Sequence, residues 1–144
     1  MAYRALDVAE EIIAYSLKIK NPITHLKLQK LLYFVQAKFL LETPHPCFSD
    51  KIEAWAFGPV VPNVYKKYKK YSRSTLKTSN NYTRVISLSD LKMIEEMVEI
   101  FKDWTPMAMV SLTHRQSPWK DAWDKYGENA EITPEAIKDF FCYE

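Results

Sequence analysis

Histidine is the side chain that most often moves protons near neutral pH, so the three histidines are the first candidates for chemistry. His114 lies in a polar segment with Ser111 and Thr113, and Ser111 is one helical turn away. A nucleophile and its base normally come from different elements, and no carboxylate lies nearby in sequence to orient the ring. We therefore expect His114 or Arg115 to tie a helix end to its neighbour. A partner contact, or a small hydrolase that uses His114 with Ser111 or Thr113, is the alternative.

Other combinations of reactive residues give a weaker indication of a functional site. Cys47 follows His45 by two residues on a proline-bracketed loop, where a partly buried thiol is expected rather than a thiolate. Cys47 and Cys142 form neither a CxxC pair nor a zinc-type cluster with histidine, so we predict no metal and no cofactor. Only two glycines occur, which excludes a dinucleotide fingerprint and a P-loop. Acidic pairs at helical spacing are expected to be solvated.

Charge is unevenly distributed along the chain. Residues 54–89 carry seven basic and no acidic side chains, whereas residues 90–144 carry twelve acidic against six basic ones. Inside the basic block, lysines and tyrosines alternate in a pattern that can hold phosphates or an acidic protein. The candidate partner surface comprises Lys66, Lys67, Tyr68, Lys69, Lys70, Tyr71 and Arg73. A solvated helix face is the alternative, and nucleic acid is the least favoured partner because no DNA- or RNA-binding motif is present.

Apolar periodicity predicts helices for most of the chain. A first helix is expected over residues 7–19 with Asp7 capping its first turn, and a second after Thr24 as the central, most buried helix, interrupted by polar residues such as Lys27 and Lys30. The lysine and tyrosine segment predicts a helix from Pro62 to about Tyr71. Residues 72–83 are expected to form an exposed loop, and a further helix is predicted over 90–103.

Three later helices are expected to start where a hydroxyl residue precedes proline, at residues 105–106, 117–118 and 133–134. Trp119 and Trp123 share a face of one of them, so they are expected in the core, with an exposed binding patch as the alternative, and Gly127 is expected to end that helix. A short strand is predicted from Ile52 to Phe57, with residues 84–87 as a candidate partner strand.

The 144 residues correspond to one domain, and 47% hydrophobic content supplies a core without disulfides. We predict a mainly α, compact single-domain bundle, residues 1–144, with about six to seven helices and at most a small β-ribbon. Acidic residues interrupt any signal-peptide core near the N-terminus, and no apolar run is long enough to span a membrane. A cytoplasmic protein with no membrane partner is the expected class.

Three segments in this order are more specific than any one alone: KLQKLLYF from Lys27, EAWAFGPVVPNVY from Glu53, and LTHRQSPW from Leu112. Together with the closing Ile137 to Phe141 segment they resemble the Panacea domain, the antitoxin domain of SocA-like, phage-associated or GepA-like proteins, over about residues 5–142. The motif residues, structural or partner-binding, are Lys27, Gln29, Lys30, Tyr33, Trp55, Gly58, Pro59, Val60, Tyr65, Thr113, His114, Pro118 and Trp119.

The resemblance implies a non-enzymatic antitoxin that neutralises a neighbouring-gene toxin, often in prophages, by direct protein–protein binding. An adaptor that presents the toxin to the protease ClpXP is implied for the SocA branch. A small hydrolase and a nucleic-acid-binding module are the remaining alternatives. Physically, Gly58 allows a turn where a Cβ would clash, the flanking prolines stiffen it, and Trp55 can seal it. The motif is therefore expected to be a scaffold first.

Overall fold

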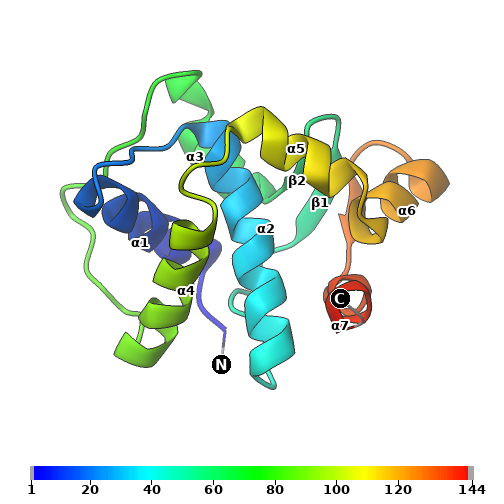
Figure 1. The fold of residues 1–144 in the computed structure, drawn as a ribbon, viewed down its shortest axis with the longest axis horizontal. Helices are drawn as coiled ribbons and strands as arrows, with labels where there is room; N and C mark the ends of the chain where they lie inside the picture. Colours follow the sequence, from blue (N-terminus) through cyan, green and yellow to red (C-terminus); the bar gives the residue numbers. More distant parts are fainter. Residues whose placement is uncertain (1, 143–144) are drawn as a thin grey trace.

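A long, almost wholly buried helix runs through the middle of the molecule (Figure 1). This helix is α2, His25–Glu42, and the computed structural model describes residues 2–142 of the chain. The side-chain oxygen of Thr24 accepts a hydrogen bond from the Lys27 amide at 3.4 Å, which confirms the predicted cap. Residues 1, 143 and 144, the ends of the predicted single domain, lie outside the described part.

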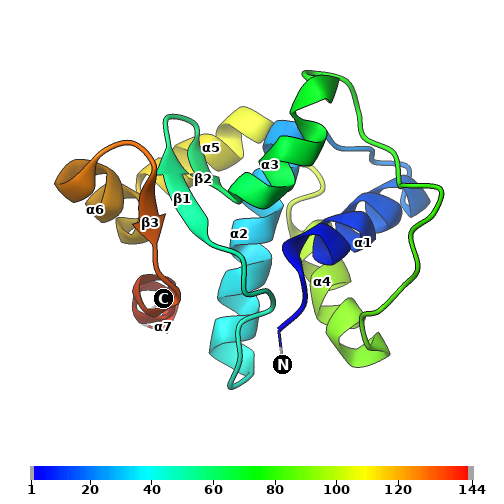
Figure 2. The same ribbon diagram turned by 180° about the vertical axis from the view of Figure 1, so that it is seen from behind.

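Helices α1 (Ala5–Lys18) and α4 (Leu88–Ile100) pack against one side of α2 and against each other (Figures 1 and 2). Helix α1 begins earlier than predicted, and Asp7 is not its cap: its carboxylate forms an ion pair with Arg4 at 3.1 Å. Helix α4 also begins earlier than predicted, because the Ser87 hydroxyl accepts from the Asp90 amide at 3.3 Å.

A small sheet covers the other side of α2. Strand β1 (Ile52–Trp55) is its centre, with β2 (Gly58–Val60) and β3 (Ala130–Ile132) antiparallel on either edge. The predicted strand from Ile52 is confirmed, although it ends at Trp55 instead of Phe57 because the chain turns there into β2. The partner strand predicted at residues 84–87 is wrong. That segment has no strand structure because Arg84 is held by Glu11 at 2.9 Å and Ser87 caps α4.

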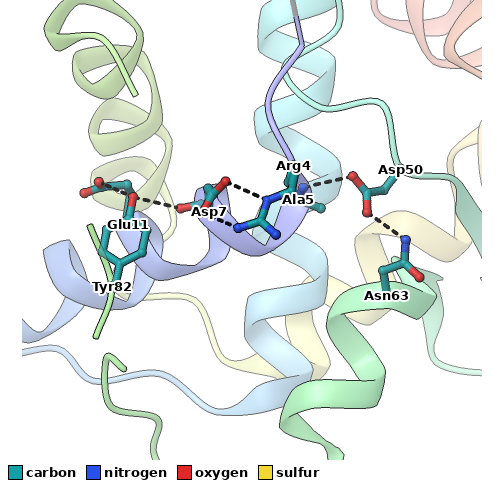
Figure 3. Close-up of polar contacts among 7 residues, drawn as sticks. All are labelled: Arg4, Ala5, Asp7, Glu11, Asp50, Asn63 and Tyr82. Atoms are coloured by element: carbon teal, nitrogen blue, oxygen red, sulfur yellow. Dashed lines mark hydrogen bonds and ion pairs between the residues drawn. The ribbon is translucent and has the colours of Figure 1, made fainter. Parts of the chain in front are cut away.

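The basic segment forms helix α3 (Pro62–Tyr68), which tightens into one 3₁₀ turn, η1 (Lys69–Tyr71). The carboxylate of Asp50 fixes the start of α3 relative to α1. It accepts the Ala5 amide at 2.9 Å and the Asn63 side-chain amide at 2.8 Å (Figure 3). Residues 72–83 then form the predicted loop, which is mostly exposed as expected except that Leu76 is buried.

Three short helices complete the chain: α5 (Pro106–His114), α6 (Ser117–Tyr126) and α7 (Pro134–Cys142). Thr105 and Thr133 cap α5 and α7 as predicted, each accepting an amide hydrogen bond of 3.1 Å. Ser117 does not cap α6, since it is itself the first helical residue and Gln116 occupies the cap position. Gly127 ends α6 with a φ of +85°, as expected.

The residues described thus contain seven α-helices and one three-stranded sheet, which confirms the mainly α prediction. Trp119 is buried and stacks on the half-buried Trp123 at 5.2 Å between ring centroids, in agreement with the predicted core position. Within residues 2–142, none of the helices combines the length and the apolar character that crossing a membrane requires.

Candidate functional site: a buried motif and a basic surface

Lys27 is buried on α2, contrary to its expected role as a polar break in the pattern. Its Nζ donates to the carbonyls of Phe101 at 2.8 Å, Lys102 at 3.3 Å and Trp104 at 2.7 Å. Phe101 is the C-cap of α4 and Lys102 and Trp104 follow it, so these carbonyls lie at the helix end that carries partial negative charge. Lys27 therefore closes the C-terminal end of α4, and its burial lowers the pKa of its ammonium group.

Lys30 lies one turn further along α2 and is completely buried. Its Nζ donates to the Pro59 carbonyl at 2.8 Å, so it fastens α2 to β2. Burial lowers the pKa of Lys30 to about 7, because the low-dielectric interior disfavours the charged form. The amine thus takes part in the scaffold and is not available to solvent.

Gly58 lies beside the Lys30 side chain at the turn into β2. Its φ is +98°, a backbone conformation that L side chains rarely adopt. A Cβ built there would be 2.7 Å from Thr113 Oγ1 and 2.8 Å from Lys30 Cε. Both findings support the sequence-based expectation that this turn requires glycine.

Other polar residues of α2 also point inward. Gln29 accepts the Val61 amide at 2.8 Å, and the Tyr33 hydroxyl donates to the Gln116 side chain at 2.8 Å. Gln36, which was not among the predicted site residues, accepts the Cys47 amide at 2.8 Å and so orders the loop after α2. A polar residue inside an otherwise apolar helix was the signal that could have identified it.

His114 connects the end of α5 to the β1–β2 turn. Its Nε2 lies 3.0 Å from the Ala56 carbonyl, and its ring stacks on Trp119 with centroids 4.0 Å apart. Trp119 in turn donates its indole N–H to the Trp55 carbonyl at 2.8 Å. The expected structural role of His114, tying a helix end to its neighbour, agrees with this geometry.

The hydroxyl groups of the hydrolase alternative have other partners. Thr113 is buried and donates to the Val110 carbonyl at 2.8 Å, while the exposed Ser111 accepts from Arg115 at 3.4 Å. Among the residues described, neither hydroxyl is hydrogen-bonded to His114. No cluster of three or more His, Cys, Asp or Glu side chains within residues 2–142 is arranged to hold a metal ion.

The remaining motif residues line the same region. Pro59, Val60 and Pro118 are buried, and the half-buried rings of Trp55 and Tyr65 lie 4.7 Å apart. Burial also raises the pKa of the Cys47 thiol, in keeping with an unreactive cysteine. The motif is thus mainly interior, and most of its polar side chains bind other parts of the chain, although the Gln29 side-chain N–H group has no partner among the described residues.

The basic segment has the opposite character. Lys66, Lys69, Lys70 and Arg73 are exposed, and we call these four residues the basic surface. Tyr71 beside them is 43% exposed, whereas Tyr68 is buried and donates to Glu10 at 2.7 Å.

Part of the positive charge is neutralised by α1. Lys67 lies 3.8 Å from the buried Glu10, and Arg84 forms an ion pair with the buried Glu11 at 2.9 Å. Glu11 also accepts from Tyr82 at 2.6 Å (Figure 3). Lys67 is exposed, but because it is paired with Glu10 we do not count it in the basic surface. The net charge of residues 54–89 gave no indication of these acidic partners, because they lie on α1, far away in sequence.

The described residues thus form a mainly helical scaffold that inward-pointing polar side chains fasten together, with cationic groups exposed on α3, on η1 and just after it. The model of the family "Antitoxin SocA-like, Panacea domain" matches residues 28–120, so the chain belongs to this family. The chain is 42% identical over 62 residues to Antitoxin SocA of Caulobacter vibrioides (strain NA1000 / CB15N). That match covers 43% of this chain and only about a third (33%) of the relative's length. No solved structure matches the chain.

Proposed function

We propose that this protein is an antitoxin that neutralises a toxin by direct protein–protein binding, and that the basic surface contacts the toxin. Family membership supports the antitoxin role, and the exposed basic surface on a fixed scaffold is the observation that supports direct binding. The toxin would present a complementary acidic patch. Such charge complementarity accelerates association more than it raises the final affinity.

The buried motif supports this role indirectly. Lys30, Gly58 and His114 hold α2, the β1–β2 turn and α5 in one arrangement, and α3 starts two residues after the end of β2. We propose that these residues are structural and that the partner contacts the basic surface instead. A rigid scaffold lowers the entropy that is lost on binding.

The proposed place of action is the cytoplasm, where free thiols such as Cys47 and Cys142 persist. The adaptor function towards ClpXP stays a second prediction from the family resemblance. Toxin levels measured with and without ClpXP in the same cells test it. Toxin that is neutralised at an unchanged level would contradict the adaptor role and support direct binding.

The central experiment compares two charge reversals in binding to the protein encoded by the neighbouring reading frame. The first variant changes Lys66, Lys69 and Lys70 to Glu. The matched control changes Lys120, Lys125 and Lys138, exposed lysines of α6 and α7, to Glu. Both variants should fold, since exposed substitutions usually change stability by less than about 0.5 kcal/mol.

We expect association to slow by about tenfold or more in the first variant and to lose its salt dependence, because the complementary charge is gone. The control should associate at the wild-type rate. Stopped-flow measurements at two salt concentrations give both quantities. Equal rates in the two variants would mean that the basic surface is only a solvated face.

A further inference from the structure

An apolar groove of about 560 Å³ lies next to the basic surface. Its apolar lining comes from Leu26, Phe57, Pro106 and Met107, which belong to α2, the β1–β2 turn and α5. Phe57 is 58% exposed and Met107 is 56% exposed. Figures 1 and 2 both show the starts of α2 and α5 at the same end of the molecule as α3.

The exposed side chains of Phe57 and Met107 have no evident role in the scaffold. Large exposed apolar side chains that line a common concavity are typical of interaction sites. An aromatic ring supplies contact area at low entropic cost, and the flexible thioether of methionine adapts to the shape of what it meets. The groove is therefore suited to receive an apolar side chain from another molecule.

The polar rim of the groove favours negative charge. Arg73 of the basic surface lies on the rim, as do Thr24 and Thr105, the residues that cap α2 and α5. The N-terminal ends of two helices thus face the groove, and each carries partial positive charge. None of the described residues that line the groove is acidic.

We infer that this groove anchors an acidic amphipathic segment of the partner protein. An apolar side chain of that segment lies between Phe57 and Met107, and a neighbouring carboxylate pairs with Arg73 and the two helix ends. The inference rests on the proposed function and deepens it. The basic surface attracts the toxin from a distance, and the groove holds it.

The experiment uses a phage-displayed library of random peptides, selected on the full chain. Three variants are then compared in binding to the synthetic form of a selected peptide. Met107→Asp places a negative charge in the groove, and Phe57→Ser removes the aromatic wall. Leu88→Asp is the matched control, because Leu88 is 77% exposed and α4 starts at the opposite end of the molecule from the starts of α2 and α5 (Figure 1). An acid in the first turn favours a helix, so neither Asp variant is expected to unfold.

We expect selected peptides in which Asp or Glu flanks Leu, Phe, Met or Trp. Their affinity should fall by about tenfold or more for Met107→Asp and Phe57→Ser and stay unchanged for Leu88→Asp. Overturning results are peptides without acidic residues, equal binding to all variants, or no binders at all. A dimer of the wild-type chain that Met107→Asp dissociates would identify the groove as a self-association face and also overturn the proposal.

Toxin neutralisation on co-expression separates this inference from the proposed function. If the wild-type chain and the folded Met107→Asp variant neutralise the neighbouring-frame protein equally, the groove inference fails and the antitoxin role stands. If the wild-type chain neither binds nor neutralises it, the proposed function fails whatever the peptides show.

Discussion

The lysines of α2 and those of the basic surface have opposite surroundings. Lys27 and Lys30 are buried, and each ammonium group donates to main-chain carbonyls. Lys66, Lys69 and Lys70 extend from α3 and η1 into solvent. The same residue type therefore fixes the fold in one region and provides long-range electrostatics in the other.

This difference indicates which positions can vary. A buried lysine requires an acceptor at a set distance, so replacing it leaves a carbonyl without a partner. An exposed lysine has few such constraints, and its substitution changes mainly the field that a partner experiences. A domain built in this way can keep its scaffold while its exposed charges change with the partner.

The largest expected effect is in the scaffold, at Gly58. Gly58→Val should destabilise the protein by about 3 kcal/mol or more, because the backbone strain at φ +98° adds to the clash with Thr113 and Lys30. Thermal and denaturant unfolding measure the loss. Gly127→Val is the control, since its φ is +85° but nothing lies within 4 Å of the added Cβ. Equal losses at both glycines would show that packing around Gly58 contributes nothing.

Lys27→Met is expected to have the next largest effect. It leaves the Trp104 carbonyl without its donor and removes one of two donors from the Phe101 and Lys102 carbonyls, which should cost about 2 kcal/mol. Lys66→Met, on the basic surface, is the paired control and should be nearly neutral in stability. Denaturant unfolding of both variants tests the comparison directly. A Lys27 variant as stable as the Lys66 variant would remove the distinction between the two groups of lysines.

The sequence predicts the elements well where local chemistry determines them. The threonines before α2, α5 and α7 each accept a hydrogen bond from a first-turn amide, as their positions predict. Apolar periodicity also identifies α2 as the central helix. The second partner of β1 could not be predicted, because β3 lies far away in sequence and its register depends on tertiary packing. The adjacent partner, β2, was missed because its glycine and proline are typical of a turn. Residues 84–87 have strand-like composition, but a long-range ion pair to α1 determines their conformation.

The candidate site is predictable to a similar degree. The glycine turn and the exposed basic helix follow from residue type and spacing. The burial of Lys27 and Lys30 does not, because a lysine in an apolar helix is ordinarily read as its exposed edge. The groove at Phe57 and Met107 joins residues of separate elements, so no local pattern marks it.

The ionisation of Lys30 gives a third test through the pH dependence of stability. Its pKa is about 7 in the folded protein, below its ordinary value of 10.5, so the unfolded chain binds more protons between these two values. The stability contribution of Lys30 is therefore least favourable below about pH 7 and improves as the pH rises towards 10.5.

Lys30→Met removes this dependence. Relative to the variant, the wild-type protein should gain about 1 kcal/mol of unfolding free energy per pH unit between pH 7 and 10. Denaturant unfolding across this range measures the difference, in which other titrating groups cancel. A flat difference for Lys30 would mean that its amine stays charged in the interior.

His114→Ala is expected to have the smallest effect, about 1 kcal/mol, because one hydrogen bond to Ala56 and one stacking contact with Trp119 are lost. The same variant separates the scaffold from the hydrolase alternative. We expect neither the wild type nor the variant to turn over ester, peptide or phosphate substrates, and we expect the melting temperature of the variant to fall. His114→Phe should restore part of the lost stability through stacking without supplying a base. Turnover by the wild type that disappears in the variant, with an unchanged melting temperature, would instead make His114 a catalytic residue and this turn a reactive site.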